Sequence, residues 1–452
     1  MIVKLICPKR KQNNGEKDKW GKEFQNIMFG TKRYSAMVTA LPTIASLTPR
    51  GIKVIIEDEN VEDINFNERV DIVGITAYTA NISRAYEIAN AFRERGVTVV
   101  LGGVHVTCFP DEALCYADSV VQGEAEDIWR DLLNDFQKNK LKKFYSAKNK
   151  PRLSLRPIPR YDLVKHHKYH YHHIQTARGC SFNCDFCSAH SFFGHKQRFK
   201  TIRQVIKEIK LVNSYEKKLI HFCDDSFVLN RKRAIRLLKA LIPLNITYTI
   251  QGTMGMQDDA ELLHFLVQSG CSCVGMGFES INQQNLIQYK KGPQYIVDNY
   301  YKFVEKIQSK GIMVSGFFIF GFDNDDMSVF KKTVEFVKAS RMAQCRLGIL
   351  TPLPHTELYD RLKKERRLLN KDWSQHDLCH VCFQPKHMSP EELQNGYNWT
   401  AKALFGLEVI FERIEAVYED WSSSGCKPKN RLSPLIANLA SYYVAHSLSE
   451  TK

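Results

Sequence analysis

The chain has 452 residues, of which 44% are hydrophobic and 25% charged, and its formal net charge is +15. This length provides for two or three globular domains, and the composition excludes a disordered protein. No apolar run reaches the roughly eighteen residues that a membrane span needs, and charged residues follow the first few positions, so we expect neither a span nor a secretory signal. Thirteen cysteines without such a signal indicate a reducing cytoplasm, where thiolates serve metal chemistry more often than disulfides.

The first 137 residues alternate short apolar runs with helical patterns, which predicts βαβ units on a doubly wound parallel sheet. We expect strands at residues 2–6, 53–56, 71–75, 97–101 and 119–121. Helices are expected at residues 37–47, 83–95 and 124–136. Ligands of such Rossmann-like sheets bind at the carboxyl ends of the strands.

Residues 138–173 are rich in Lys, Arg, Pro and His and are expected to form a linker. A second series of strands then follows, at residues 174–177, 219–223, 246–251, 272–278, 313–320 and 346–350. Helical patterns separate them, at residues 202–213, 231–241, 259–268 and 295–310. Six β/α units predict a partial (β/α)6 TIM-type barrel over residues 174–384, with its chemistry at the strand C-termini.

Residues 385–452 are expected to form a C-terminal helical region. Ser389 is placed to cap a helix that has Pro390 in its first turn. The amphipathic pattern of this helix runs to about residue 418.

Three cysteines follow the first expected barrel strand: Cys180, Cys184 and Cys187. Three residues separate the first two, and two residues separate the last two. Three thiolates bind three irons of a [4Fe–4S] cluster and leave the fourth iron open to another ligand. Zinc is the alternative, and it needs a fourth nitrogen or sulfur ligand. His190 or His195 stands close enough in sequence to supply one.

With this cysteine spacing, an aromatic residue before the last cysteine (Phe186) and six β/α units around it, the chain resembles the radical S-adenosylmethionine superfamily. The resemblance implies that the open iron binds S-adenosylmethionine. It also implies contacts to this cofactor at the strand ends, from Phe186, Asp224, Gln251, Glu279, Ser280, Ile319 and Gly321. Asp224, with Asp225, would hold the methionine amino end, although a helix-capping turn is an alternative reading.

Glu279 would bond the ribose hydroxyls, with a surface ion pair as the alternative. The usual Gly-x-Ile-x-Gly pattern is only partly present, because Phe317 replaces its first glycine.

Small and hydroxyl residues follow the strands of the N-terminal domain, as in the cobalamin-binding branch of this superfamily. The positions that would contact cobalamin are Thr76, Tyr78, Gly102, Gly103, His105 and Glu124. Small residues let a flat macrocycle approach the backbone, although a domain that has lost its cofactor is the alternative.

The sequence differs from that of many cobalamin proteins at the residue that binds cobalt. Many cobalamin proteins carry a histidine after the first strand, but here that loop begins Cys7-Pro8-Lys9, and the first histidine of the chain is His105. We therefore expect cobalamin bound without its dimethylbenzimidazole or a histidine on cobalt. Cys7, Tyr78 and Met37 are candidates for the lower face, with packing as their alternative role.

The remaining cysteines and histidines are expected to be structural. The histidines of residues 166–173 fit a connecting strand better than a metal site, and Cys271, Cys273 and Cys345 fit core packing better than an auxiliary cluster. Cys379 and Cys382 have metal-like spacing without a second pair nearby.

The resemblance implies an enzyme that methylates an unactivated carbon through a 5′-deoxyadenosyl radical and methylcobalamin. A cobalamin-dependent cyclase or rearrangement enzyme is the alternative. The expected partners are a small-molecule or peptide substrate and a flavodoxin- or ferredoxin-type electron donor. No side chain is assigned a catalytic role.

The net charge leaves a different class open, a basic RNA-binding or corrinoid-carrier protein. The basic residues are spread over helical stretches, as at Lys207, Lys210 and Arg231, without aromatic partners that stack on bases. The sequence therefore favours the enzyme over nucleic-acid binding.

Overall fold

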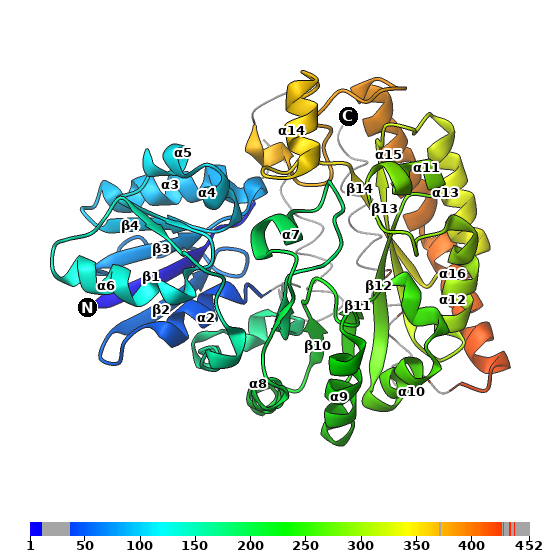
Figure 1. Cartoon of the computed structure of the whole chain (residues 1–452), viewed down its shortest axis with the longest axis horizontal. Helices are drawn as coiled ribbons and strands as arrows, with labels where there is room; N and C mark the ends of the chain where they lie inside the picture. Colours follow the sequence, from blue (N-terminus) through cyan, green and yellow to red (C-terminus); the bar gives the residue numbers. More distant parts are fainter. Residues whose placement is uncertain (11–36, 370–371, 427, 429–433, 435–437, 439–452) are drawn as a thin grey trace.

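The computed structural model describes residues 1–10, 37–369 and 372–426, together with Pro428, Pro434 and Asn438. Two sheet-based domains lie side by side, the N-terminal one in blue and cyan and the second in green to yellow (Figure 1). This arrangement confirms the expected α/β class with parallel sheets.

The N-terminal sheet has six parallel strands in the order β2-β1-β3-β4-β5-β6. Their bounds are β1 (Ile2–Cys7), β2 (Lys53–Asp58), β3 (Ile72–Thr76), β4 (Thr98–Gly102), β5 (Ser119–Gln122) and β6 (Phe144–Ser146). The first five match the predicted strands. The sixth comes from the predicted linker, so the sheet extends past residue 137.

Helices cover both faces of this sheet, as the doubly wound prediction requires. They are α2 (Ala40–Leu47), α3 (Ile82–Arg93), α4 (Val104–Cys108), α5 (Pro110–Leu114) and α6 (Trp129–Gln137). Phe92 of α3 packs with Val73 on one face, and Trp129 of α6 packs with Leu5 on the other. Both faces are therefore buried, which is why the strands read as continuous apolar runs.

The second domain is an open six-stranded parallel sheet in the order β14-β13-β12-β11-β10-β7. Its strands are β7 (Tyr171–Ile174), β10 (Leu219–Phe222), β11 (Tyr248–Gln251), β12 (Cys271–Glu279), β13 (Met313–Phe320) and β14 (Gln344–Ile349). The helices are α7 (Ser188–Phe193), α8 (Ile202–Tyr215), α9 (Arg231–Leu241), α10 (Ala260–Ser269), α11 (Gln283–Gln288), α12 (Tyr300–Gln308) and α13 (Ser328–Ala339). This is the predicted partial barrel.

The start of the barrel was predicted three residues too late. The first strand is β7, so His172 and His173 belong to the barrel instead of a solvent-exposed connection. The predicted strand at residues 174–177 is instead the passage from β7 into β8 (Ala177–Arg178), which pairs antiparallel with β9 (Arg198–Phe199). One strand of this short hairpin precedes the cysteine segment in the chain, and the other follows it.

The C-terminal region packs on the barrel as helices α14 (Glu357–Lys364), α15 (Pro390–Phe405) and α16 (Leu407–Ser423). The single helix predicted to residue 418 is two helices, because the chain turns to extended backbone at Gly406. Ser389 caps α15 in a reciprocal pair with Glu392, as predicted. Among the described residues no helix is long and apolar enough to cross a membrane.

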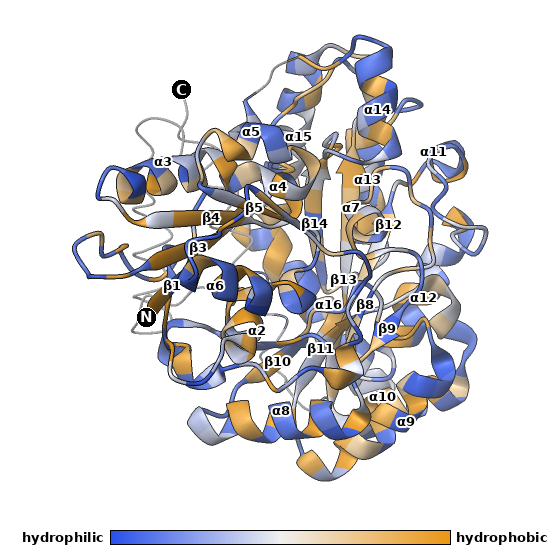
Figure 2. Cartoon of the chain, turned by 60° about the vertical axis from the view of Figure 1, so that its left-hand side comes forward, coloured by the Kyte–Doolittle hydropathy of each residue, from blue (hydrophilic) through white to orange (hydrophobic). Residues whose placement is uncertain are grey.

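Hydrophobic residues gather on the strands and on the sheet-facing sides of the helices, whereas the outer faces of α6 and α9 are hydrophilic (Figure 2). The helix α15 comes close to α13 because Gly396 lies against the ring of Phe330. A Cβ atom at Gly396 would stand 2.1 Å from that ring.

We therefore expect Gly396→Ala to lower the free energy of unfolding by about 1–3 kcal/mol, the usual cost of overpacking a core. Urea denaturation followed by circular dichroism measures the change. Gly255→Ala is the matched control, since a Cβ atom there meets nothing within 4 Å. Equal stability of the two variants would contradict the close packing of α13 and α15.

Candidate functional site

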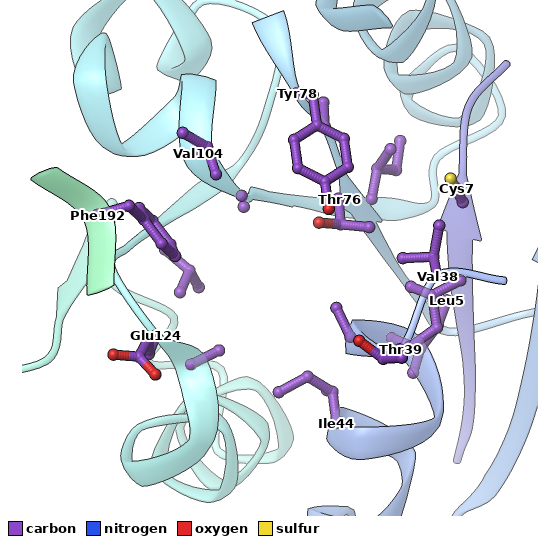
Figure 3. A pocket seen from close by; sticks show the side chains of 18 of the residues that line it. Leu5, Cys7, Val38, Thr39, Ile44, Thr76, Tyr78, Val104, Glu124 and Phe192 are labelled. Carbon is purple, nitrogen blue, oxygen red and sulfur yellow. The ribbon is translucent and has the colours of Figure 1, made fainter. Parts of the chain in front are cut away.

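A cavity of about 640 Å³ lies between the two domains. On one side it is lined by the carboxyl ends of β1, β3, β4 and β5, and on the other by residues of β7, β8 and α7. Figure 3 shows Thr76, Tyr78 and Phe192 around this space, with Glu124 at its edge. The strand order reverses between β1 and β3, where doubly wound sheets bind their ligands.

The backbone at the end of β4 is held close to the end of β3. Gly103 has a φ of +107°, and a Cβ atom there would lie 2.5 Å from the carbonyl oxygen of Ala77. Only glycine fits this position, so the backbones at the ends of β3 and β4 meet here without an intervening side chain and form part of the cavity floor. Gly102 and Thr76 line the same floor.

Tyr78 projects into the cavity, and 59% of its surface is accessible there. Desolvation by the protein around the phenol, with the nearby thiols of Cys7 and Cys223, raises the pKa of Tyr78 to about 12. Tyr78 therefore stays neutral and can donate a hydrogen bond. Cys7 and Met37, the other candidates for the lower face of a corrin, also line the cavity.

His105 lies outside the cavity. Its ring is fully buried, with Nδ1 3.3 Å from the Thr79 hydroxyl and Nε2 3.5 Å from Glu112. The ring also packs edge-on against Trp373. These contacts give His105 a structural role at the seam between the domains, so we do not carry forward its predicted contact to cobalamin.

Among the described residues that line the cavity, the one histidine is His173. It comes from the barrel strand β7 and not from the loop after β1. On the side of the N-terminal domain the described lining residues offer hydroxyl, thiol, thioether, amide and carboxylate groups, but no imidazole.

Buried ion pairs join the two domains beside the cavity. Glu124, which follows β5, accepts hydrogen bonds from Arg178 at 2.6 Å and from Arg198 at 2.7 Å. Arg178 also pairs with Glu126. The side chains of Glu124 and Arg178 are only 2% and 11% exposed. Glu124 thus lines the cavity as predicted in sequence, but its carboxylate is occupied by the two arginines of the β8–β9 hairpin.

The three predicted cluster cysteines lie on the loop between β8 and α7. Cys184 is buried, while Cys180 and Cys187 are half-buried. Burial raises the pKa of all three thiols, and the nearby positive charge of Lys291 opposes this rise at each of them. One ammonium group acts on all three thiols, so they face a common region, which fits the three-cysteine ligand set of a [4Fe–4S] cluster.

His190, a candidate fourth ligand for zinc, supports the loop through its ring. Its Nε2 lies 2.9 Å from the carbonyl oxygen of Cys184, so this nitrogen is engaged with the backbone. His195 stacks on His190 at 4.8 Å. Within the described part of the chain, no three His, Cys, Asp or Glu side chains are grouped to hold a single metal ion.

Glu279 ends β12 in a left-handed conformation, with a φ of +63°. Its carboxylate pairs with Lys291 at 2.5 Å, and both side chains are largely buried. The pair lies directly over Gly277, where a Cβ atom would stand 2.2 Å from the Glu279 carboxylate. Such backbone strain in a non-glycine residue is characteristic of functional sites.

Asp224 and Asp225 have different roles. The carboxylate of Asp224 is buried and accepts hydrogen bonds from the backbone N–H groups of Thr176 at 2.5 Å and Ala177 at 3.0 Å. It therefore fastens the end of β10 to the start of β8 and does not line the cavity. Asp225 lines the cavity instead and accepts a hydrogen bond from the N–H of Gly179 at 3.0 Å.

The other predicted S-adenosylmethionine contacts surround the carboxyl end of the barrel. The Gln251 amide lies over Gly275, and Ser280 accepts hydrogen bonds from Asn282 and Asn285. The remaining positions are Ile319, which is half-buried, Gly321, whose N–H bonds Asp325, and Phe186, which packs against Phe322.

Lys291 and Arg178 were not predicted as site residues. Arg178 precedes the cysteines in sequence, but its partners Glu124 and Glu126 lie more than fifty residues away. Lys291 follows Glu279 by twelve residues, and only the fold turns it back toward the cysteines. No local signal in the sequence marks either residue.

Family models match most of the chain. Residues 174–337 match the model of the radical SAM superfamily, and residues 42–133 match the B12 binding domain. Residues 356–445 match a domain of unknown function, DUF4070.

The chain is 31% identical to the bacteriochlorophyllide d C-8(2)-methyltransferase of Chlorobaculum tepidum, over 78% of this chain and 81% of the relative. It is 29% identical to the bacteriochlorophyllide d C-12(1)-methyltransferase of the same organism, over 85% and 86%. In fold it is similar to the radical S-adenosylmethionine methyltransferase TsrM from Kitasatospora setae, solved with cobalamin and a [4Fe–4S] cluster bound. That match covers 99% of both chains, with a TM-score of 0.69 and 15% identity.

Replacing Glu124 by Gln tests the ion pairs between the domains. We expect E124Q to lower the free energy of unfolding by about 3 kcal/mol, because it leaves buried arginine charge without its partner. Urea denaturation followed by circular dichroism measures this change.

The matched control is E335Q, which removes the same charge from an exposed pair with Lys331 at 3.8 Å. It should change stability by less than about 1 kcal/mol. If E124Q proved as mild as E335Q, the network would not hold the two domains together.

Proposed function

The chain belongs to the cobalamin-binding branch of the radical S-adenosylmethionine superfamily, and on this basis we propose that it methylates an unactivated carbon of its substrate. The relatives with which it shares about 30% identity over most of their length are named as carbon methyltransferases. A [4Fe–4S] cluster, S-adenosylmethionine and cobalamin are the cofactors of this branch.

The observation that carries the proposal is the single cavity shared by the two domains. Its lining combines the cobalamin-type strand ends of the N-terminal sheet with Arg178, Ser188 and Asp225, which adjoin the cysteine loop. A methyl carrier and a radical generator bound on opposite sides of this cavity would both reach one substrate. This arrangement supports methyl transfer inside an enclosed site.

On the barrel side, Cys180, Cys184 and Cys187 would hold three irons of the cluster. Lys291, beside the three thiols, provides a positive charge suited to a carboxylate such as that of a bound amino acid. Asp225, lining the cavity, is a better candidate than Asp224 for an ammonium group. When bound, the cofactors supply the radical and the transferable methyl group, and the protein orients them and excludes water.

On the side of the N-terminal sheet, Gly102 and Gly103 leave backbone exposed to the cavity, which suits the approach of a macrocycle. Tyr78 stands in the middle of this surface (Figure 3). Of the residues that line the cavity, Tyr78 would lie against the corrin, and its neutral phenol would offer a hydroxyl group there instead of an imidazole.

The strongly basic chain also fits a partner of opposite charge. We include an acidic flavodoxin- or ferredoxin-type protein as the electron donor, because opposite net charges accelerate docking.

The test of function is to supply the anaerobically reconstituted enzyme with S-adenosylmethionine that carries a deuterated methyl group. We expect deuterium in the product and 5′-deoxyadenosine in the reaction mixture, both measured by mass spectrometry. A product without deuterium would contradict methyl transfer and favour the cyclase or rearrangement alternative.

The Cys184→Ala variant should form no 5′-deoxyadenosine, because the cluster loses one of its three thiolates. Cys115→Ala is the control, since Cys115 is exposed on the N-terminal domain and should leave the activity intact. Retained 5′-deoxyadenosine formation in Cys184→Ala would refute the radical assignment.

The ligand of cobalt can be tested separately, by spectroscopy. The electron paramagnetic resonance spectrum of the enzyme loaded with cob(II)alamin should lack the nitrogen splitting that a coordinated imidazole gives. His173→Ala should leave this spectrum unchanged. Nitrogen splitting in the wild-type protein that disappears in His173→Ala would show a histidine ligand from the barrel and contradict the expectation.

A further inference from the structure

The concave face of the barrel carries polar side chains in register. His173, His221 and Thr249 stand opposite one another on three neighbouring strands, and Cys273 continues the row on β12, where it packs in a hydrophobic cluster with Trp421 of α16. The residues that alternate with them, including Phe222 and Tyr248, belong to the hydrophobic core beneath the outer helices. Side chains on successive strand positions point to opposite faces, so the polar set lines the interior of the barrel.

Arg346 lies on this concave face, on the edge strand β14. Its neighbour Cys345 is fully buried on the other face, where its sulfur contacts Arg413 of α16. Arg346 itself is exposed, and its guanidinium lies 5.5 Å from the centre of the Phe317 ring on the adjacent strand. No carboxylate of the described residues forms an ion pair with it.

The charge of Arg346 reaches across the barrel. Strands β14 and β7 are the two opposite edges of the sheet, yet this charge acts on Tyr171 of β7 and on His221 of β10. The sheet therefore curls around the guanidinium group. Burial, with the charge of Arg346, lowers the pKa of His221 to about 4, so His221 is neutral and Arg346 supplies the positive charge of this region.

We propose that Arg346 binds a carboxylate group of the substrate inside the barrel. The planar guanidinium forms two parallel hydrogen bonds with a carboxylate, and Phe317 holds its plane in place. The one positive charge of Arg346 balances a monoanion, whereas a phosphate dianion would leave a surplus negative charge on a face whose histidine, His221, is neutral. The substrate class is thus an organic acid.

The same face leads to the cavity between the domains. His173 lies in the polar set of the barrel interior and also lines the cavity, as does Cys223 at the end of β10. A substrate anchored at Arg346 would extend from the interior toward the cysteine loop. The inference rests on the proposed function in treating this interior as the substrate site.

Binding of a matched pair of probes tests the inference without turnover. 2-Naphthoate and 2-naphthamide have the same shape and differ in charge, and isothermal titration calorimetry with the reconstituted protein gives their dissociation constants. We expect the wild-type protein to bind the carboxylate at least fivefold more tightly than the amide. Arg346→Gln should reduce this preference below twofold, and Arg346→Lys should keep only part of it.

Arg203→Gln is the matched control, because it removes the same charge from an exposed position of α8. It should keep the wild-type preference. A preference below fivefold in the wild-type protein, or one that Arg346→Gln retains, would overturn the proposal.

A second measurement needs no variant. Phenylglyoxal should modify Arg346 in the wild-type protein, as located by peptide mass spectrometry, and 2-naphthoate but not 2-naphthamide should protect it. Equal protection by both probes, or by neither, would also overturn the proposal. These assays do not depend on methyl transfer. A product without deuterium would therefore not contradict the carboxylate site, and a negative binding result would not contradict methyl transfer.

Discussion

The architecture depends on the buried ion pairs that Glu124 makes with Arg178 and Arg198. Charges removed from water are tolerated only where each is matched, so this contact fixes how the end of β5 meets the β8–β9 hairpin. The hairpin brackets the cysteine loop, and β5 borders the floor of the cavity. Together with other contacts between the domains, such as the hydrogen bond from Tyr169 to Asp58, this junction sets the distance between the two surfaces on which the proposed cofactors would bind. It also explains why a carboxylate predicted to contact cobalamin faces arginines.

Most of the fold could be predicted because its strands are apolar runs between helical patterns. The exceptions have physical reasons. The strand β6 is three residues long within a lysine-rich stretch, so it carries almost no periodic signal. The strand β7 alternates histidine with apolar residues and was read as a solvent-exposed connection, although His173 faces a polar barrel interior. Gly406 divides the last long helix through its extended backbone, which the amphipathic pattern does not reveal.

The site residues likewise include some that the sequence could predict and some that it could not. Thr76, Tyr78 and Gly102 were predicted because parallel strands bring their carboxyl ends together, and the three cysteines were predicted from their spacing after a strand. The choice between Asp224 and Asp225 depended on side-chain direction, which neighbouring residues do not share. Lys291 and Arg346 could not be found, since their significance comes from groups far away in the chain. Their side chains matter through the charge that they bring to groups on other strands, and composition alone gives no sign of that placement.

The strand β6 determines where the chain can be cut to produce the N-terminal domain alone. It forms the outer edge of the N-terminal sheet and pairs along β5. A fragment that ended at the sequence-predicted boundary, residue 137, would leave the N–H and C=O groups of β5 open, and unpaired edges of this kind promote association between chains. An independently expressed N-terminal half should therefore extend past Ser146. Aggregation of a shorter fragment would reflect this missing strand and not an inability of the domain to fold by itself.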